Sequence, residues 1–235
     1  MDNFPETVED FLDGQILLIN KPLGWTSFDV VKKIKNLIRT KYSLKKIKVG
    51  HAGTLDPLAT GLLIVCTGKF TKLISKIQGQ EKNYTGTITL GGTTPSYDLE
   101  TEFENTFDVS EITEEILHQT AKQFVGEQDQ MPPIFSAKKV DGEKAYVVAR
   151  KGGEINLKTN RVTIKEFELT KIDLPNVEFK ASVTKGTYIR SLAYDFGKAL
   201  NNGAHLSVLR RTVIGDFKIE DAKSIDGFLK KLVTK

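Results

Sequence analysis

The sequence contains little cysteine and histidine, and this shortage excludes several kinds of site. Cys66 is the only cysteine among 235 residues, so the chain can form neither an internal disulfide nor a metal site built on several cysteines. The three histidines, His51, His118 and His205, are far apart and match no metal-ligand spacing. We therefore expect that the protein holds no metal.

Long apolar runs and a basic N-terminus are also absent. No stretch approaches the roughly 18 to 20 consecutive apolar residues that span a bilayer. Residues 1–6 are acidic in character, whereas a signal peptide begins with basic residues. With 39% hydrophobic residues and a mean hydropathy of -0.25, the chain carries enough apolar material for one large core or two modest ones. We expect a globular protein of the cytoplasm with no membrane partner.

The charges are unevenly distributed, although the net charge of +4 is small. Residues 30–55 contain no acid, and their basic residues are Lys32, Lys33, Lys35, Arg39, Lys41, Lys45, Lys46 and Lys48. Residues 83–121 contain no Lys or Arg, and their acids are Asp98, Glu100, Glu102, Glu104, Asp108, Glu111, Glu114 and Glu115. Such a separation steers a nucleic acid onto one face. A solvated helix face and an acidic loop also explain the charges, and the charges alone favour this simpler interpretation.

Periodicity and turn residues divide the chain into helices and strands. Thr26 and Asp29 form a capping-box pattern, after which apolar residues recur at helical spacing and lysines occupy the opposite face. Further helices are predicted at residues 113–125, 145–150 and 190–200. Strands are predicted at residues 15–19, 62–66, 84–90, 162–172, 177–183 and 186–189.

These elements interleave without the strict alternation of a parallel α/β fold. The pattern therefore predicts the α+β class, with a mixed, mostly antiparallel central sheet flanked by helices. Because no internal repeat or low-complexity linker is present, we expect a single domain over residues 1–235. Within it, residues 91–112 are predicted to form an acidic, turn-rich insertion and residues 218–235 a short C-terminal tail.

The loop at residues 50–61 is the most informative segment. It holds several glycines, which allow a ligand to approach the backbone closely, and one carboxylate, Asp56, in a neighbourhood otherwise without acids. A lone carboxylate in such a loop is a candidate nucleophile or base. Asp followed by Pro is also a common start of a turn, so the spacing alone leaves both interpretations open.

At this point the sequence resembles a family, the bacterial tRNA pseudouridine synthases that modify uridine 55. The similarity covers roughly residues 15–217, and several ordered motifs are far more specific than one. The segments that carry it are residues 20–22 (Asn-Lys-Pro), 24–27 (Gly-Trp-Thr-Ser), 51–61, 82–84 (Lys-Asn-Tyr), 131–133 (Met-Pro-Pro), 136–138 (Ser-Ala-Lys), 186–192, 205–206 and 209–212.

The resemblance implies a pseudouridine synthase fold with its active site in a central cleft. It implies that Asp56 is the catalytic aspartate, that Tyr84 lies under the uracil as a candidate acceptor of the C5 proton, and that Arg190 pairs with the aspartate. Tyr188 and Leu209 match positions that line the pocket.

Further residues are expected to bind the RNA. His51 matches the residue that enters the RNA when the target base leaves, and Thr54 and Leu55, beside the aspartate, are expected to contact the substrate. Lys21, Lys82 and the basic face at residues 32–48 are candidates for phosphate contacts, which bind with little regard to base identity. The expected partner is the T stem-loop of transfer RNA, with a monomeric enzyme and no obligate protein partner.

The chemistry fits these residue types. Isomerisation breaks the bond between the sugar and uracil N1, turns the base, and forms a new bond at C5. No redox change occurs, so no cofactor is expected, but a carboxylate must add to C6 or act at the ribose. An arginine beside Asp56 keeps it ionised in a dry pocket, and aromatic walls at Tyr84 and Tyr188 receive a base that leaves its stack.

The sequence departs from the family at two places. Phe135 stands where the family usually has tyrosine, so any hydrogen bond from that hydroxyl is lost. Many relatives also have a C-terminal RNA-binding domain, for which residues 218–235 leave too little chain. We therefore expect the catalytic domain to bind the RNA elbow largely unaided.

Three other functions remain open. A guide-RNA-dependent pseudouridine synthase shares these motifs but normally has the additional C-terminal domain. A tRNA-folding chaperone without catalysis would not need Asp56. A nucleoside hydrolase or glycosidase would place a second carboxylate near Asp56.

Overall fold

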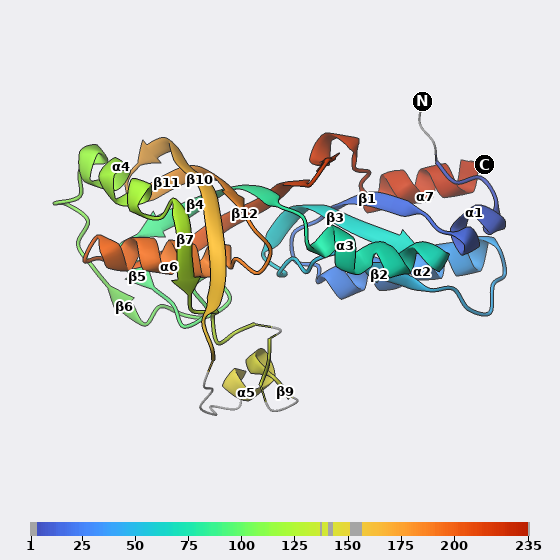
Figure 1. Cartoon of the computed structure of the whole chain (residues 1–235), viewed down its shortest axis with the longest axis horizontal. Coiled ribbons are helices and arrows are strands. Elements are labelled where there is room, and N and C mark those ends of the chain that lie inside the picture. Colours follow the sequence, from blue (N-terminus) through green and yellow to red (C-terminus); the bar gives the residue numbers. More distant parts are fainter. Residues whose placement is uncertain (1–3, 137, 141–142, 151–156, 235) are drawn as a thin grey trace. The chain divides into compact units, whose positions relative to one another are not determined.

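The computed structural model describes residues 4–136, 138–140, 143–150 and 157–234, and it divides the chain into two compact units (Figure 1). The first unit is Met1–Asn83 with Arg210–Lys235, and the second is Tyr84–Leu209. The chain passes between them in two strands, β4 (Lys82–Leu90) and β12 (Ala204–Ile214), each of which begins in one unit and ends in the other. The single domain that the sequence predicts stays a prediction.

The first unit is built around β3 (Ala59–Thr67), whose nine residues are almost all buried. β3 pairs antiparallel with β1 (Ile16–Lys21) and with β2 (Val49–His51). Its other elements are α1 (Val8–Asp13), α2 (Ser27–Lys41), η1 (Gly68–Leu73), α3 (Ile74–Gln78), β13 (Phe217–Lys218), η2 (Ile219–Asp221) and α7 (Ile225–Thr234).

Two helices, α2 and α7, share one hydrophobic core with β1 and β3 (Figure 1). The predicted capping box of α2 is present: Thr26 Oγ1 accepts from the Asp29 amide, and the Asp29 carboxylate accepts from the Thr26 amide. Val30, Ile34 and Ile38 are fully buried, whereas most of the basic residues that follow from Lys32 are exposed. The predicted apolar and basic faces of this helix are therefore confirmed.

The segment predicted as a C-terminal tail is folded. In α7, Phe228 and Leu232 are buried in the core of the first unit, and the rings of Phe4 and Phe228 lie 5.4 Å apart. The Lys223 amide also donates to the Leu18 carbonyl of β1. Residues 218–234 therefore contribute to the stability of the unit that carries Asp56.

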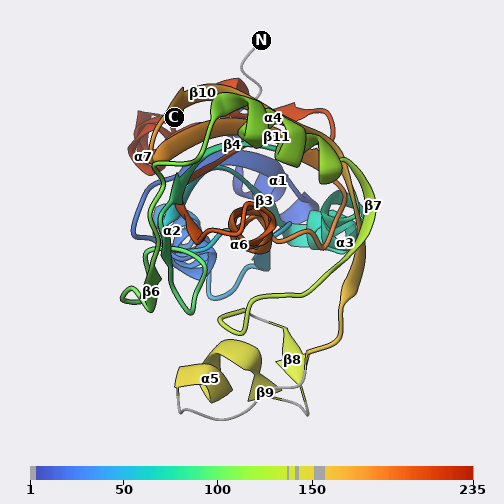
Figure 2. The ribbon, with the colours of Figure 1, turned by 90° about the vertical axis from the view of Figure 1, so that its left-hand side faces the viewer.

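The second unit is a strongly curved antiparallel sheet wrapped around one helix. Figure 2 shows α6 (Ile189–Ala199) end-on, with β4, β11 (Asn176–Val183) and β10 (Asn160–Asp173) arching over it. The strand order is β12-β4-β11-β10-β7, with β7 at Gly126–Gln130. The remaining elements are β5 (Gly92–Thr93), β6 (Asn105–Thr106), α4 (Glu114–Gln123), β8 (Lys139–Val140), β9 (Glu143–Lys144) and α5 (Ala145–Arg150).

Aromatic rings fill the space between α6 and this sheet. The Phe167 ring of β10 lies edge-on to the rings of Phe179 in β11 and Phe196 in α6, at centroid distances of 5.7 and 5.5 Å. Phe124, which follows α4, contacts both Phe167 and Phe196. Such edge-to-face pairs hold α6 firmly against the sheet, and Arg190 lies in the first turn of that helix.

The α+β class with a mixed, mostly antiparallel sheet is confirmed, as are the predicted helices at α2, α4, α5 and α6 and the β10–β11 hairpin. The strand predicted at residues 186–189 is wrong. Gly186 has a φ of +86°, and the Thr187 hydroxyl donates to the Thr184 carbonyl, which closes a turn instead. Ala137, in the predicted Ser-Ala-Lys motif, lies outside the described residues. Of the helices in the described ranges, none has the length and apolarity to cross a membrane.

Candidate active site

Asp56 lies in a tight loop between β2 and β3, which we call the Asp56 loop (residues 52–58). The Ala52 amide donates to the Ile64 carbonyl at 2.8 Å, and the Ala59 amide donates to the Asp56 carbonyl at 3.1 Å, so both ends of the loop are fixed to β3 or to each other. Gly53 has a φ of +112°, a conformation that favours glycine. Asp56 itself is half-buried. The carboxylate is thus carried on a loop of defined shape.

A buried arginine in the segment 209–212, Arg211 of β12, holds this loop. Its Nε donates to the Leu62 carbonyl at 2.8 Å, its Nη2 to Gly53 at 3.1 Å and its Nη1 to Thr54 at 3.3 Å. Arg211 is 1% exposed. One guanidinium therefore joins the start of the Asp56 loop to the strand that follows it, and its fixed fork of donors suits this bridging.

Ser27 at the start of α2 holds the loop from another side. Its Oγ accepts from the Leu55 amide at 2.8 Å and donates to the Leu55 carbonyl at 3.0 Å. Leu55 is buried, so its side chain packs inside the first unit, although it was expected to contact substrate. One hydroxyl thus fixes both backbone groups of the residue before Asp56. Of the two residues expected to contact the substrate beside Asp56, Thr54 is the exposed one.

Lys21 and Lys82, which the sequence offers as phosphate-binding candidates, are both buried. The Lys21 ammonium donates to the carbonyls of Pro22, Trp25 and Pro57. Burial lowers the pKa of Lys21 to about 8, and the charge of Asp56 opposes this shift. Lys82 Nζ donates to the Gln78 and Gln80 carbonyls. The buried positions of Lys21 and Lys82 favour a role in holding the neighbouring loops over contact with phosphate. The exposed candidates for phosphate contacts are the basic residues of α2.

His51 precedes the Asp56 loop at the end of β2 and is half-buried. Its Nδ1 is buried and has no hydrogen-bond partner in the structure. Burial lowers the pKa of His51, the Gly53 backbone opposes this shift, and the charge of Arg211 adds to it. The lowered pKa favours the neutral ring at pH 7.

In the second unit, Arg190 is almost fully buried at the start of α6. Its Nη1 donates to the Ser96 carbonyl at 3.1 Å and its Nη2 to the Phe135 carbonyl at 2.9 Å. Its Nε lies 3.7 Å from the Asp98 carboxylate, and both side chains are about 5% exposed. Arg190 is thus fixed in position by the backbone on either side. The expected pairing with Asp56 stays a prediction.

Asp98 belongs to a buried, hydroxyl-rich turn within the segment predicted as an acidic insertion. The Thr94 and Ser96 hydroxyls both donate to the Asp98 carbonyl, and Asp98 Oδ1 accepts from the Glu100 amide. The run of Thr, Ser and Asp at residues 93–98 is the signal that could have identified a structured turn here. The turn orients the carboxylate next to Arg190.

The expected pocket residues of the second unit lie in different surroundings. Tyr84 is buried in β4, whereas Tyr188 and Leu209 are half-buried. The Gln130 side chain fixes the backbone of Tyr188: its Oε1 accepts from the Tyr188 amide at 2.8 Å and its Nε2 donates to the Tyr188 carbonyl at 3.0 Å. Tyr188 is therefore held at the N-cap of α6, two residues before Arg190. Among the described residues, no group of His, Cys, Asp and Glu is placed to hold a metal ion.

Comparison with known proteins points to one enzyme family. Residues 39–189 match the model of the TruB family pseudouridylate synthase (N terminal domain). The curated tRNA pseudouridine synthase B of Flavobacterium johnsoniae is 59% identical over 96% of this chain and 99% of its own length. That of Phocaeicola vulgatus is 51% identical over 93% of each chain.

A solved structure is also similar over nearly the whole chain. A chain in the crystal structure of a Cbf5-Nop10-Gar1 complex is 29% identical, with a TM-score of 0.72 over 96% of this chain. The match covers 56% of that chain, so this protein spans only about half of its length.

Proposed function

Because the chain belongs to the TruB family and is a pseudouridine synthase, we propose that its substrate is transfer RNA and that it isomerises the uridine at position 55 of the T loop. Curated relatives named tRNA pseudouridine synthase B match over nearly their full lengths, which supports the substrate. The observation that carries the mechanism is the Asp56 loop, in which Arg211 and Ser27 hold the backbone on the N-terminal side of the carboxylate.

Asp56 acts as the nucleophile of this reaction. It adds to C6 of the uracil or attacks C1′ of the ribose, the bond between N1 and C1′ breaks, and the detached base turns until C5 faces the sugar. A C5–C1′ bond then forms, C5 loses its proton, for which Tyr84 is the proposed acceptor, and N1 gains a proton. The bond between Asp56 and C6 or C1′ breaks, which releases the carboxylate and the product. Electrons and atoms balance without an oxidant, a reductant or a cofactor. A carboxylate on a fixed loop suits a reaction in which the same base must leave and return.

Arg190 supplies positive charge to the same uridine, in our proposal as the partner of Asp56. Its buried backbone contacts pre-organise the guanidinium before the substrate binds, so little reorganisation is needed during the reaction. Tyr188 and Leu209 line the pocket for the flipped base, and the neutral His51 ring fills the space that the base leaves in the RNA stack. Thr54 contacts the substrate beside Asp56.

The exposed basic residues that begin at Lys32 bind RNA phosphates and give the complex its affinity. We propose that the two units form one catalytic domain that acts as a monomer in the cytoplasm, without an obligate protein partner. Binding through phosphates predicts that the affinity for tRNA falls steeply as salt rises.

The test is incubation of an unmodified tRNA transcript with the protein alone, followed by carbodiimide labelling and primer extension. The native protein and the Asp13→Asn control, which changes an exposed carboxylate of the same unit, should both produce a stop at the T-loop uridine. Asp56→Asn should bind the transcript without producing the stop.

Other outcomes would identify the rival functions. Modification that requires an added guide RNA would indicate a guide-dependent synthase. Full biological function of Asp56→Asn would indicate a folding chaperone. Release of free uracil with an abasic product would indicate a hydrolase.

A further inference from the structure

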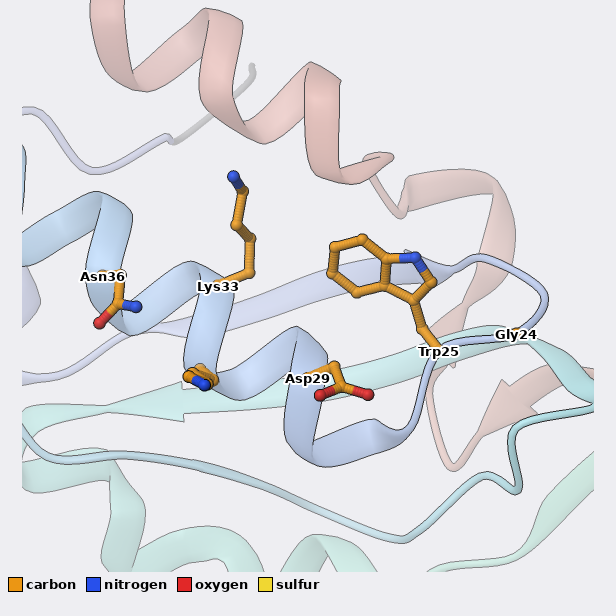
Figure 3. Close-up of a pocket in the computed structure, with 6 residues that line it drawn as sticks. Gly24, Trp25, Asp29, Lys33 and Asn36 are labelled. Atoms are coloured by element: carbon orange, nitrogen blue, oxygen red, sulfur yellow. The ribbon is translucent and has the colours of Figure 1, made fainter.

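The first unit carries a pocket of about 430 Å³ beside the start of α2, and Lys32, one of the proposed phosphate-binding residues, is part of its wall. Its walls are Gly24, Trp25, Asp29, Lys32, Lys33 and Asn36. Figure 3 shows the Trp25 ring and the Lys33 side chain projecting to the same side of α2. The volume lies within the range of roughly 300–1,000 Å³ that is usual for small-ligand sites.

The pocket combines a flat apolar surface with positive charge. Trp25, the only tryptophan of the chain, is half-buried: it packs against the core cluster that contains Phe228 and keeps part of its ring open to the pocket. Lys32 and Lys33 are exposed. The one acid of the pocket, Asp29, is already engaged by the amide and hydroxyl of Thr26. A base that stacks on an indole and a phosphate that pairs with an ammonium group match these surfaces.

The pocket is also joined to the Asp56 loop. The Gly24 amide donates to the Pro57 carbonyl at 2.9 Å, and the Lys21 ammonium binds the Trp25 and Pro57 carbonyls together. Ser27, two residues after Trp25, holds both backbone groups of Leu55. An RNA that reaches Asp56 therefore has the Trp25 pocket within a short distance on the same compact unit.

We propose that the Trp25 pocket binds one unpaired nucleotide of the RNA substrate other than the target uridine, with its base on the Trp25 ring and its phosphate at Lys33. The proposal rests on the proposed function in one respect, that the substrate is a structured RNA with unpaired bases. Residues 30–55 contain no acid, so the surface beside the pocket attracts a polyanion. This favours a nucleotide of an RNA over a protein partner as the ligand of the pocket. Stacking is tolerant of base identity, so the site anchors the RNA and leaves the choice of target to the active site.

Trp25 itself provides the probe, since no other residue contributes indole fluorescence. A T stem-loop hairpin titrated into the native protein should quench this fluorescence to saturation. The titration is repeated with hairpins that lack the base of one loop nucleotide at a time. We expect the quenching to disappear for one hairpin, whose missing base is not the target uridine. No quenching at saturating RNA, or quenching that survives every base removal, would overturn the proposal.

Variants separate stacking from folding. Trp25→Phe keeps a ring in the core and should weaken hairpin binding roughly threefold, and Trp25→Ala by about tenfold, a factor within the range for loss of one stacked base. Lys33→Ala does not touch the core and should lower the salt dependence of binding by about one phosphate contact. Lys76→Ala, an equal charge change at an exposed lysine of α3 in the same unit and outside the basic residues 32–48, is the matched control. Equal effects of Lys33→Ala and Lys76→Ala would overturn the assignment of the phosphate to Lys33.

Pseudouridine formation is measured on the same hairpin in parallel. If the hairpin is modified but Trp25 fluorescence does not respond, the pocket proposal fails and the proposed function stands. If fluorescence responds as expected but no pseudouridine forms, the proposed function fails and the nucleotide site stands.

Discussion

Removal of the Arg211 guanidinium tests whether the Asp56 loop is positioned by long-range contacts. The three carbonyls that it binds, at Gly53, Thr54 and Leu62, lie at 3.1, 3.3 and 2.8 Å from its nitrogens, and the side chain is 1% exposed. Arg211→Met keeps an apolar side chain of similar length and removes every donor. Water cannot easily replace them at a site so deeply buried.

The expected loss of stability follows from these bonds. A hydrogen bond with a charged partner contributes roughly 1.5–3 kcal/mol, and removal of one partner of a buried charged group costs about 3–5 kcal/mol in total, since such losses are not additive. We therefore expect Arg211→Met to lower the free energy of unfolding by about 4 kcal/mol. Arg211→Lys keeps the charge, but one ammonium group cannot reach both Leu62 and Gly53 as the fork does, so we expect a loss of about 2 kcal/mol.

The catalytic consequence should be visible in Arg211→Lys, which is expected to fold. A shift of Asp56 by about 1 Å can cost on the order of 100-fold in rate, so kcat should fall strongly while RNA binding by the basic residues of α2 is retained. Urea denaturation and single-turnover kinetics measure the two effects. Arg210→Met, the same charge change at a half-exposed neighbour, is the control for stability. An Arg211→Met protein with native stability and native kcat would refute the reasoning.

Three further substitutions test other parts of the structure. Asp98→Asn removes the carboxylate beside Arg190 and should lower the free energy of unfolding by about 2 kcal/mol. It should also reduce kcat with little change in RNA affinity, and native kinetics would contradict a role of Asp98 in positioning Arg190. Burial raises the pKa of Asp195 to about 6, so the stabilising contribution of this carboxyl group is present below pH 4 and is lost as the pH rises through 6. Asp195→Asn should therefore stabilise the protein by about 1 kcal/mol at pH 8 but not at pH 4. Thermal unfolding at both pH values measures this, and an equal effect at both would contradict it. Gly61→Ala should prevent stable folding, because φ is +103° and a Cβ atom would lie 2.2 Å from the Arg211 carbonyl oxygen; a soluble variant with native melting behaviour would contradict this.

The elements that could be predicted from sequence are those with one clear period. Val30, Ile34 and Ile38 repeat at helical spacing, and the β10–β11 hairpin has a turn with Pro175 between two alternating strands. β12 has no such pattern, because it combines buried Arg211 with exposed Val208, against the usual preferences of both residues. Its place in the sheet follows from tertiary contacts and could not be predicted from local sequence.

The candidate site divides in the same way. Asp56 could be identified from its motif, whereas its support could not, because Arg211 is 149 to 158 residues away from the carbonyls that it binds. Leu55 and Lys21 are expected to contact the RNA; their side chains are buried, and this contact stays a prediction. A motif indicates which residues belong together but not which of them face the ligand and which hold the loop.

Release of tritium from tRNA labelled at C5 of uridine measures the central claim most directly, since C5 gives up its hydrogen only when it becomes bonded to the sugar. With the native protein, tritium equivalent to one uridine per tRNA should appear in water. With Asp56→Asn, tRNA should bind with native affinity and release no tritium above background. Release by Asp56→Asn at the native rate would show that this carboxylate is not the catalytic group.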